Sequence, residues 1–73
     1  MNYGQTHVYG VSLSYLMANG ERSFSYYEIP ADSENEATDF VRQGFYREHP
    51  LAVYKPDVSA KFLYTDYWSY LRF

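Results

Sequence analysis

YLMANGERSF, residues 15–24, decides the fold of this chain, because an Asn-Gly pair stands there between two runs of alternating residues. Asn-Gly tolerates the positive φ angles that a two-residue type I′ hairpin turn requires. With Asn19 and Gly20 as the loop, the expected cross-strand pairs are Ala18 with Glu21, Tyr15 with Phe24, Leu13 with Tyr26, and Val11 with Glu28. The stretch therefore predicts a β-hairpin whose register follows from its turn.

This register divides the hairpin into an apolar face and a serine-rich face. The apolar face would hold Val11, Leu13, Tyr15, Met17, Phe24 and Tyr26. The other face would hold Ser12, Ser14, Leu16, Ser23, Ser25 and Tyr27. A slip of one residue would move the side chains of a strand to its opposite face, so the residue pattern and the turn chemistry support the same pairing. We expect strands over 7–17 and 22–29, with a bulge near Tyr27 that returns Ile29 to the core side.

A helix is predicted after Pro30-Ala31, which ends the second strand. Ser33 and Glu36 have the spacing of a capping box, a common helix start. The buried stripe of this helix is predicted from its spacing to be Ala37, Phe40, Val41 and Phe45. Gly44 is one candidate for its end. We favour a longer helix, over about residues 33–48, because Pro50 is the first residue that forbids continuation.

The C-terminal region, residues 51–73, is expected to complete the sheet. Residues 51–55 are a short apolar strand candidate. Residues 58–73 are dense in aromatic rings, which favours a strand, although helical spacing leaves a helix open. With residues 1–6 expected to be flexible, the chain is predicted to be a single small α+β domain. Its antiparallel sheet would have three or four strands, in the order ββαβ or ββαββ, with one helix packed on one face.

Composition narrows the function classes. The chain has 73 residues, no cysteine and a net charge of −3, with a sequence pI near 5.1. A general nucleic-acid binder needs clustered cations, so this charge argues against one. No apolar run approaches the ~20 residues of a membrane-spanning helix, and the N-terminus lacks the features of a signal peptide. We expect no membrane partner and a cytoplasmic location, which is the host cytoplasm if a phage encodes the chain.

His7 and His49 are the two histidines that could serve catalysis or metal binding. His7 begins a strand and His49 precedes a proline in a connector, and no His-x-x-His or Glu-x-x-His spacing occurs. The four glycines are too scattered for a phosphate-binding loop. We expect no catalytic residue, no metal ligand and no cofactor, and therefore no enzymatic activity.

Two features indicate a binding surface for another macromolecule. Five carboxylates lie between Glu28 and Asp39 with no basic residue among them, which predicts an anionic patch for a basic partner. Ten tyrosines, five phenylalanines and one tryptophan exceed what a core of this size can hold, and Tyr and Trp are frequent binding hot spots. The predicted partner-binding residues are Glu28, Asp32, Glu34, Glu36, Asp39, Tyr64, Tyr67, Trp68 and Tyr70.

The leading hypothesis is a non-enzymatic protein-binding module that inhibits a larger protein or nucleoprotein complex by covering its basic, nucleic-acid-binding or regulatory surface. In size, charge and expected ββα order the chain resembles small acidic proteins of phages and mobile elements, including anti-CRISPR and other anti-defence inhibitors. This resemblance has no residue motif. The alternatives are a single-stranded nucleic-acid binder that stacks bases on an aromatic sheet face, a small hydrolase or nuclease that uses His7 or His49, and a structural or assembly subunit. A homodimer formed through an edge strand, either residues 51–55 or the C-terminal segment, also remains open.

Overall fold

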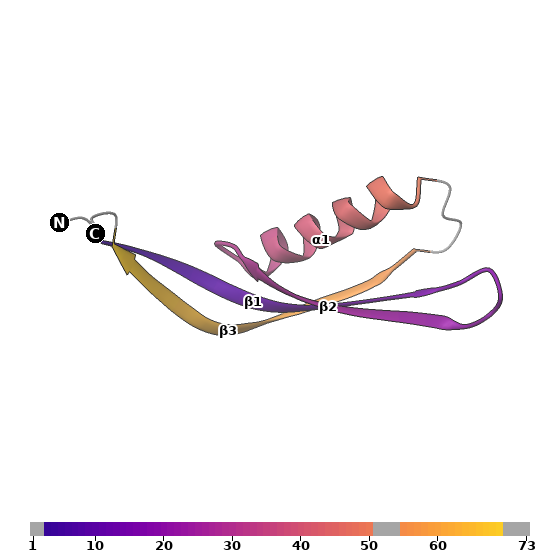
Figure 1. The fold of residues 1–73 in the computed structure, drawn as a ribbon, viewed down its shortest axis with the longest axis horizontal. Helices are drawn as coiled ribbons and strands as arrows, with labels where there is room; N and C mark the ends of the chain where they lie inside the picture. Colours follow the sequence, from indigo (N-terminus) through magenta and orange to yellow (C-terminus); the bar gives the residue numbers. More distant parts are fainter. Residues whose placement is uncertain (1–2, 51–54, 70–73) are drawn as a thin grey trace.

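The computed structural model describes residues 3–50 and 55–69. Its elements are β1 (Tyr3–Leu16), β2 (Arg22–Pro30), α1 (Glu34–Glu48) and β3 (Asp57–Ser69). The strands form one antiparallel sheet in the order β2-β1-β3, and α1 lies along one side of it (Figure 1). The predicted α+β fold is confirmed in its ββαβ form. A fourth strand is not seen in the described ranges, and residues 51–54 of the predicted short strand lie outside them.

The central strand, β1, is longer than the part of the sheet that α1 covers. Its pairing with β2 begins at Val8, whereas its pairing with β3 begins at Tyr3, opposite Ser69. Figure 1 shows the result as a two-stranded ribbon that extends beyond the helix, and the molecule measures 53 × 20 × 20 Å. Residues 3–6, expected to be flexible, therefore lie within a strand.

The β1–β2 hairpin turn is not the predicted one. The Gly20 N–H donates to the Met17 carbonyl over 3.0 Å, and the Met17 N–H donates to the Glu21 carbonyl over 2.7 Å. Gly20 has a φ of +88°, and no non-glycine residue that the structure describes has a positive φ. These features define a three-residue loop, a type I turn followed by a left-handed glycine. Asn19 does not take the positive φ of a type I′ turn, and its Oδ1 instead accepts from the Glu21 N–H over 3.0 Å.

The longer loop shifts the β2 register by one residue. Leu13 pairs with Ser25 and Tyr15 with Ser23, where the sequence predicted Tyr26 and Phe24. Because side chains alternate between faces, every β2 side chain lies on the face opposite to the predicted one. The predicted grouping of Leu13, Tyr15, Phe24 and Tyr26 on one apolar face is wrong. The first two lie on the helix side, and the two β2 rings lie on the helix-free face.

The remainder of β2 follows from the same shift. Its register with β1 is continuous from Arg22 to Pro30, so no bulge occurs near Tyr27. Ile29 reaches the core side without one, as the partner of Tyr9. An irregularity lies on β3 instead, where Val8 pairs with Tyr64 but Tyr9 pairs with Phe62. Leu63 is therefore the extra residue of a β-bulge.

The core lies between α1 and the centre of the sheet. Val11 is fully buried at the centre of β1. The other buried members of the cluster are Tyr9, Leu13, Ala31, Ala37, Val41 and Phe45. Of the four helix residues predicted to be buried, Ala37, Val41 and Phe45 are buried, but Phe40 is 65% exposed. The reason is that α1 packs mainly on β3 and β1, whereas Phe40 is on the side of the helix toward β2.

The helix start is close to the predicted capping box. Ser33 has extended backbone angles, and its Oγ accepts a hydrogen bond from the Glu36 N–H over 3.2 Å. The Glu36 carboxylate accepts from the backbone N–H of Asp32 over 3.2 Å, whereas in a capping box it would accept from that of Ser33. At the other end, α1 continues through Gly44 to Glu48, as in the longer of the two predicted helices.

Candidate functional site

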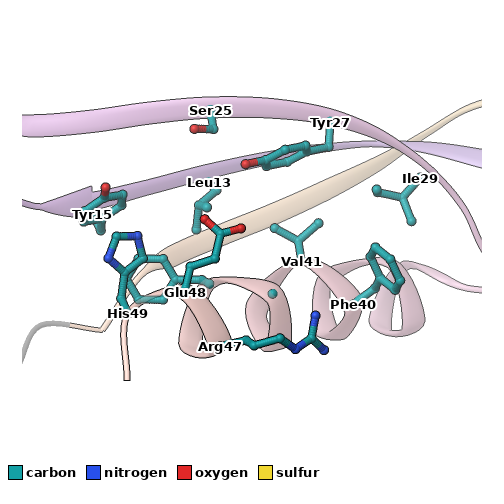
Figure 2. A pocket seen from close by; sticks show the side chains of 12 residues that line it. Leu13, Tyr15, Ser25, Tyr27, Ile29, Phe40, Val41, Arg47, Glu48 and His49 are labelled. Carbon is teal, nitrogen blue, oxygen red and sulfur yellow. The ribbon is translucent and has the colours of Figure 1, made fainter. Parts of the chain in front are cut away.

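A groove with a volume of about 320 Å³ lies between α1 and β2 (Figure 2). Leu13, Tyr27 and Ile29 line it from the sheet. Phe40, Val41 and Phe45 line it from the helix. The groove exists because α1 packs on β1 and β3 and leaves the inner face of β2 uncovered.

The two ends of the groove differ in chemistry. Near the start of α1, Phe40 and Tyr27 are 65% and 43% exposed, and Ile29 is half-buried. Figure 2 shows Phe40 and Ile29 on opposite walls at this end. Large apolar side chains in a contiguous, open position are typical of interaction sites. This end of the groove is therefore the apolar docking surface, defined as Tyr27, Ile29 and Phe40.

The far end of the groove is a packed ring cluster. The Phe45 ring lies 4.8 Å from Tyr15 and 4.8 Å from His49, between ring centroids, and Tyr15 lies 5.3 Å from His49. The His49 N–H also donates to the Phe45 carbonyl, which ends the helix. These contacts give His49 a structural role at the C-terminus of α1.

His7 lies in a different part of the fold. Its Nδ1 is 2.9 Å from the Thr65 hydroxyl, and its ring meets the edge of Phe62. The chain thus places its two histidines in separate environments, one in the β1–β3 ladder and one at the helix end. Within residues 3–50 and 55–69, no group of three or more His, Asp or Glu side chains is arranged to hold a metal ion.

The predicted acidic patch is divided by the sheet. Asp32, Glu34, Glu36 and Asp39 are exposed around the start of α1. Glu28 is also exposed, but it is paired with Gly10 and lies on the helix-free face. Asp39 forms an ion pair with Arg42 at 3.0 Å, and Glu36 takes part in the helix cap. The carboxylates near the docking surface are therefore those of the helix and its leading loop.

Two of the predicted aromatic residues, Tyr64 and Tyr67, lie on β3, at the opposite edge of the sheet from β2. Tyr64 is 48% exposed and Tyr67 is 74% exposed, both on β3. The central strand separates them from β2 and from the acidic segment that follows it. The Trp68 side chain and Tyr70 lie outside the described part of the chain. The carboxylates and rings that the sequence assigned to one surface thus belong to different parts of the molecule.

The sequence reasoning missed two groups of exposed rings. On the helix-free face, Phe24 is 75% exposed and Tyr26 is 57% exposed. The Tyr26 ring lies over Gly10, where an added Cβ would come within 3.1 Å of two ring carbons. The other group is the docking surface itself. A three-residue loop with glycine in the left-handed region would have predicted the faces of the β2 rings. The exposure of Phe40 depends on where α1 packs, which no local signal gives.

An ion pair crosses the helix-free face. Arg22 of β2 contacts Asp57 of β3, and both residues flank β1 at positions opposite Leu16 and Ser14. Beside it, Gly10, Ser12, Tyr26, Ser59 and Lys61 line a shallow hollow of about 290 Å³. This face therefore carries rings and charges of both signs.

The one described helix is too short and too polar to cross a membrane.

Comparisons with known proteins identify no relative of this chain. No protein-family model matches the chain, and no curated protein or solved structure matches it.

Proposed function

We propose that this chain is a non-enzymatic protein-binding module whose groove between α1 and β2 takes an apolar segment of a partner with a basic surface. The observation that carries the proposal is the 65% exposure of Phe40 beside the 43% exposed Tyr27 and the half-buried Ile29. Small monomers rarely leave rings of this size uncovered at a hollow unless the site binds something.

The charge around the docking surface supports a basic partner. Glu36 precedes Phe40 by one helical turn and therefore lies on the same side of α1. Asp32 and Glu34 add negative charge at the same end of the helix. Arg42 offsets Asp39, and Arg47 lines the groove together with Glu48, so the excess of negative charge lies at the start of α1. Complementary charge of this kind steers association and selects partners.

An inhibitor is the specific form of this proposal. A module that covers a basic surface with carboxylates competes there with nucleic-acid phosphates, because both are anions. An anti-defence role, such as that of anti-CRISPR proteins, is supported by the small size and net charge of −3. The wider proposal of a protein-binding module stands without it.

Replacement of Phe40 by Ala tests the groove. Affinity purification of the tagged chain from its native host first identifies the partner, and titration then compares variants. We expect Phe40→Ala to weaken binding by about tenfold or more, as for a central hot spot. Tyr46→Ala is the matched control, because Tyr46 is a 41% exposed ring on the same helix that does not line the groove. Equal losses in the two variants would contradict the proposal.

The charge contribution needs variants that preserve α1. Changing Glu36 or Asp39 would also remove the cap contact or the ion pair with Arg42. Asp32→Asn combined with Glu34→Gln avoids both contacts, and we expect it to slow association and to flatten its salt dependence. Glu21→Gln with Asp66→Asn removes the same charge elsewhere and should leave the association rate unchanged.

A second candidate function is favoured by the helix-free face. Phe24 and Tyr26 are exposed there, and Lys61 lies opposite Gly10 on the neighbouring strand. Aromatic rings on an open sheet can stack single-stranded bases. Titration with labelled oligonucleotides decides between the candidates. Salt-dependent binding that Phe24→Ala reduces would favour nucleic acid, and its absence at micromolar protein would remove this candidate.

A further inference from the structure

The edge of β2 presents free backbone groups in a defined pattern. The Met17 N–H donates to the Glu21 carbonyl, and the Ala31 N–H donates to the His7 carbonyl. These two bonds show which pairs of the β1–β2 ladder are hydrogen-bonded pairs. Since hydrogen-bonded pairs recur at every second residue, the odd-numbered residues of β2 direct their N–H and C=O groups toward β1. Those of Arg22, Phe24, Tyr26 and Glu28 therefore point to the other side. In the described ranges, β2 has no second neighbour on that side.

We propose that two copies of this chain form a symmetric dimer by antiparallel pairing of β2 with β2, centred on Ser25. In this register Phe24 pairs with Tyr26 of the second copy, and Arg22 pairs with Glu28. Each pair occurs twice, because a two-fold axis relates the copies. The backbone N–H and C=O groups of all four residues point away from β1. The same register therefore gives these groups hydrogen-bond partners on the second copy.

In this register the side chains of one copy are complementary to those of the other copy. Cross-strand aromatic pairs and pairs of opposite charge both stabilise antiparallel ladders. Arg22 is 41% exposed in its pair with Asp57, and its guanidinium has donors left for a second carboxylate. A register centred on Tyr26 would instead place Phe24 opposite Glu28 and Arg22 opposite Pro30, which has no N–H to donate. The Ser25-centred register is therefore preferred.

The other edge of the sheet, formed by β3, is less suited to pairing with a second copy. β3 contains the extra residue Leu63, which interrupts a regular ladder, and it carries an exposed Lys61. Bulges and lysines are the usual devices that keep an edge strand from pairing. By contrast, the nine residues of β2 keep one register throughout. The second copy is thus expected on β2, and the dimer does not depend on the proposed function of the groove.

A disulfide test reports the register directly. Ser25 would face Ser25 of the second copy in a non-hydrogen-bonded pair, with Cα atoms ~4.5 Å apart, which a disulfide can span. The chain has no cysteine of its own. We expect Ser25→Cys to give a covalent dimer on mild oxidation. Ser23→Cys is the control on the same strand face, because it would lie opposite Tyr27 of the second copy, and it should form no covalent dimer. Similar cross-linking in both variants, or none in Ser25→Cys, would overturn the proposal.

A charge-swap experiment tests the Arg22–Glu28 contact. Arg22→Glu and Glu28→Arg should each weaken dimerisation by about tenfold or more, because like charges then meet twice. A mixture of the two variants should form a heterodimer in which both contacts are restored. Sedimentation equilibrium measures all three samples, and circular dichroism checks that each variant is folded. A wild-type chain that remains monomeric at its solubility limit, or a mixture no tighter than its components, would refute the dimer.

Discussion

At the residue scale, similar side chains on neighbouring strands have opposite environments. Leu13 on β1 is 5% exposed and belongs to the core, whereas Phe24 on β2 is 75% exposed. The difference follows from the one-residue shift of the hairpin, since a shifted strand turns each side chain to the other face. A large ring at the surface contributes contact area to a partner rather than to the core.

Alanine substitutions at these two positions test which side chains of the hairpin pack in the core. Leu13→Ala should lower the free energy of unfolding by about 2–5 kcal/mol, because it leaves a cavity in the core. In the Glu28→Arg background, which weakens the proposed dimer, Phe24→Ala should lower it by less than about 1 kcal/mol, as for a surface position. Urea denaturation measures both values. Under the two-residue loop expected from the sequence, Phe24 would be a core residue and its loss would cost about 3–5 kcal/mol.

At the element scale, the hairpin loop determines which surfaces exist. A loop of three residues, Ala18 to Gly20, places the rings of Phe24 and Tyr26 on the helix-free face. The same loop places Tyr27 and Ile29 on the helix side, where α1 leaves them partly uncovered. The groove and the exposed sheet face are therefore both consequences of the loop length together with the position of the helix.

Substitution of Gly20 tests the loop conformation. A Cβ added at Gly20 would meet no atom within 4 Å, so any cost of Gly20→Ala comes from its φ of +88°. We expect a loss of about 1–2 kcal/mol in the free energy of unfolding. Gly44→Ala is the control in α1, where the added Cβ also meets nothing, and it should stabilise by about 0.5–1 kcal/mol. Equal effects at the two glycines would contradict the left-handed loop.

At the scale of the whole molecule, a three-stranded sheet with one helix leaves much of its surface unprotected. Among residues 3–50 and 55–69, only the centre of β1 is paired on both sides and covered by α1. No described element covers the helix-free face of the sheet or pairs with the outer edge of β2. Such a fold buries a small core and offers large areas for association.

Amide hydrogen exchange reports this arrangement across the sheet. In the Glu28→Arg variant, expected to be monomeric, the amides of Ser23, Ser25 and Tyr27 should exchange slowly. Those of Phe24 and Tyr26 should exchange rapidly, because they point to the free edge. In the proposed wild-type dimer these two amides should become protected. Slow exchange at consecutive β2 positions of the monomer would show that the edge is covered in another way.

The sequence by itself determined the hairpin, the helix and their order, and it favoured a strand for the C-terminal region without excluding a helix. The alternation along β1, the Ser33–Glu36 cap and the spacing of Ala37, Val41 and Phe45 are local signals, and each depends on residues a few positions apart. The exposure of the carboxylates from Asp32 to Asp39 also follows from local chemistry, since charged side chains at a helix start remain in water.

Only the tertiary structure decided the hairpin register and the groove. Asn19-Gly20 suits a two-residue loop and a three-residue loop equally well, because both allow a positive φ at the glycine. The alternation in β2 does not separate them either, since rings occur on both of its faces, at Phe24 and Tyr26 and at Tyr27. The choice depends on which β2 face the core buries, and that requires contacts from α1 and β3, which are distant in sequence.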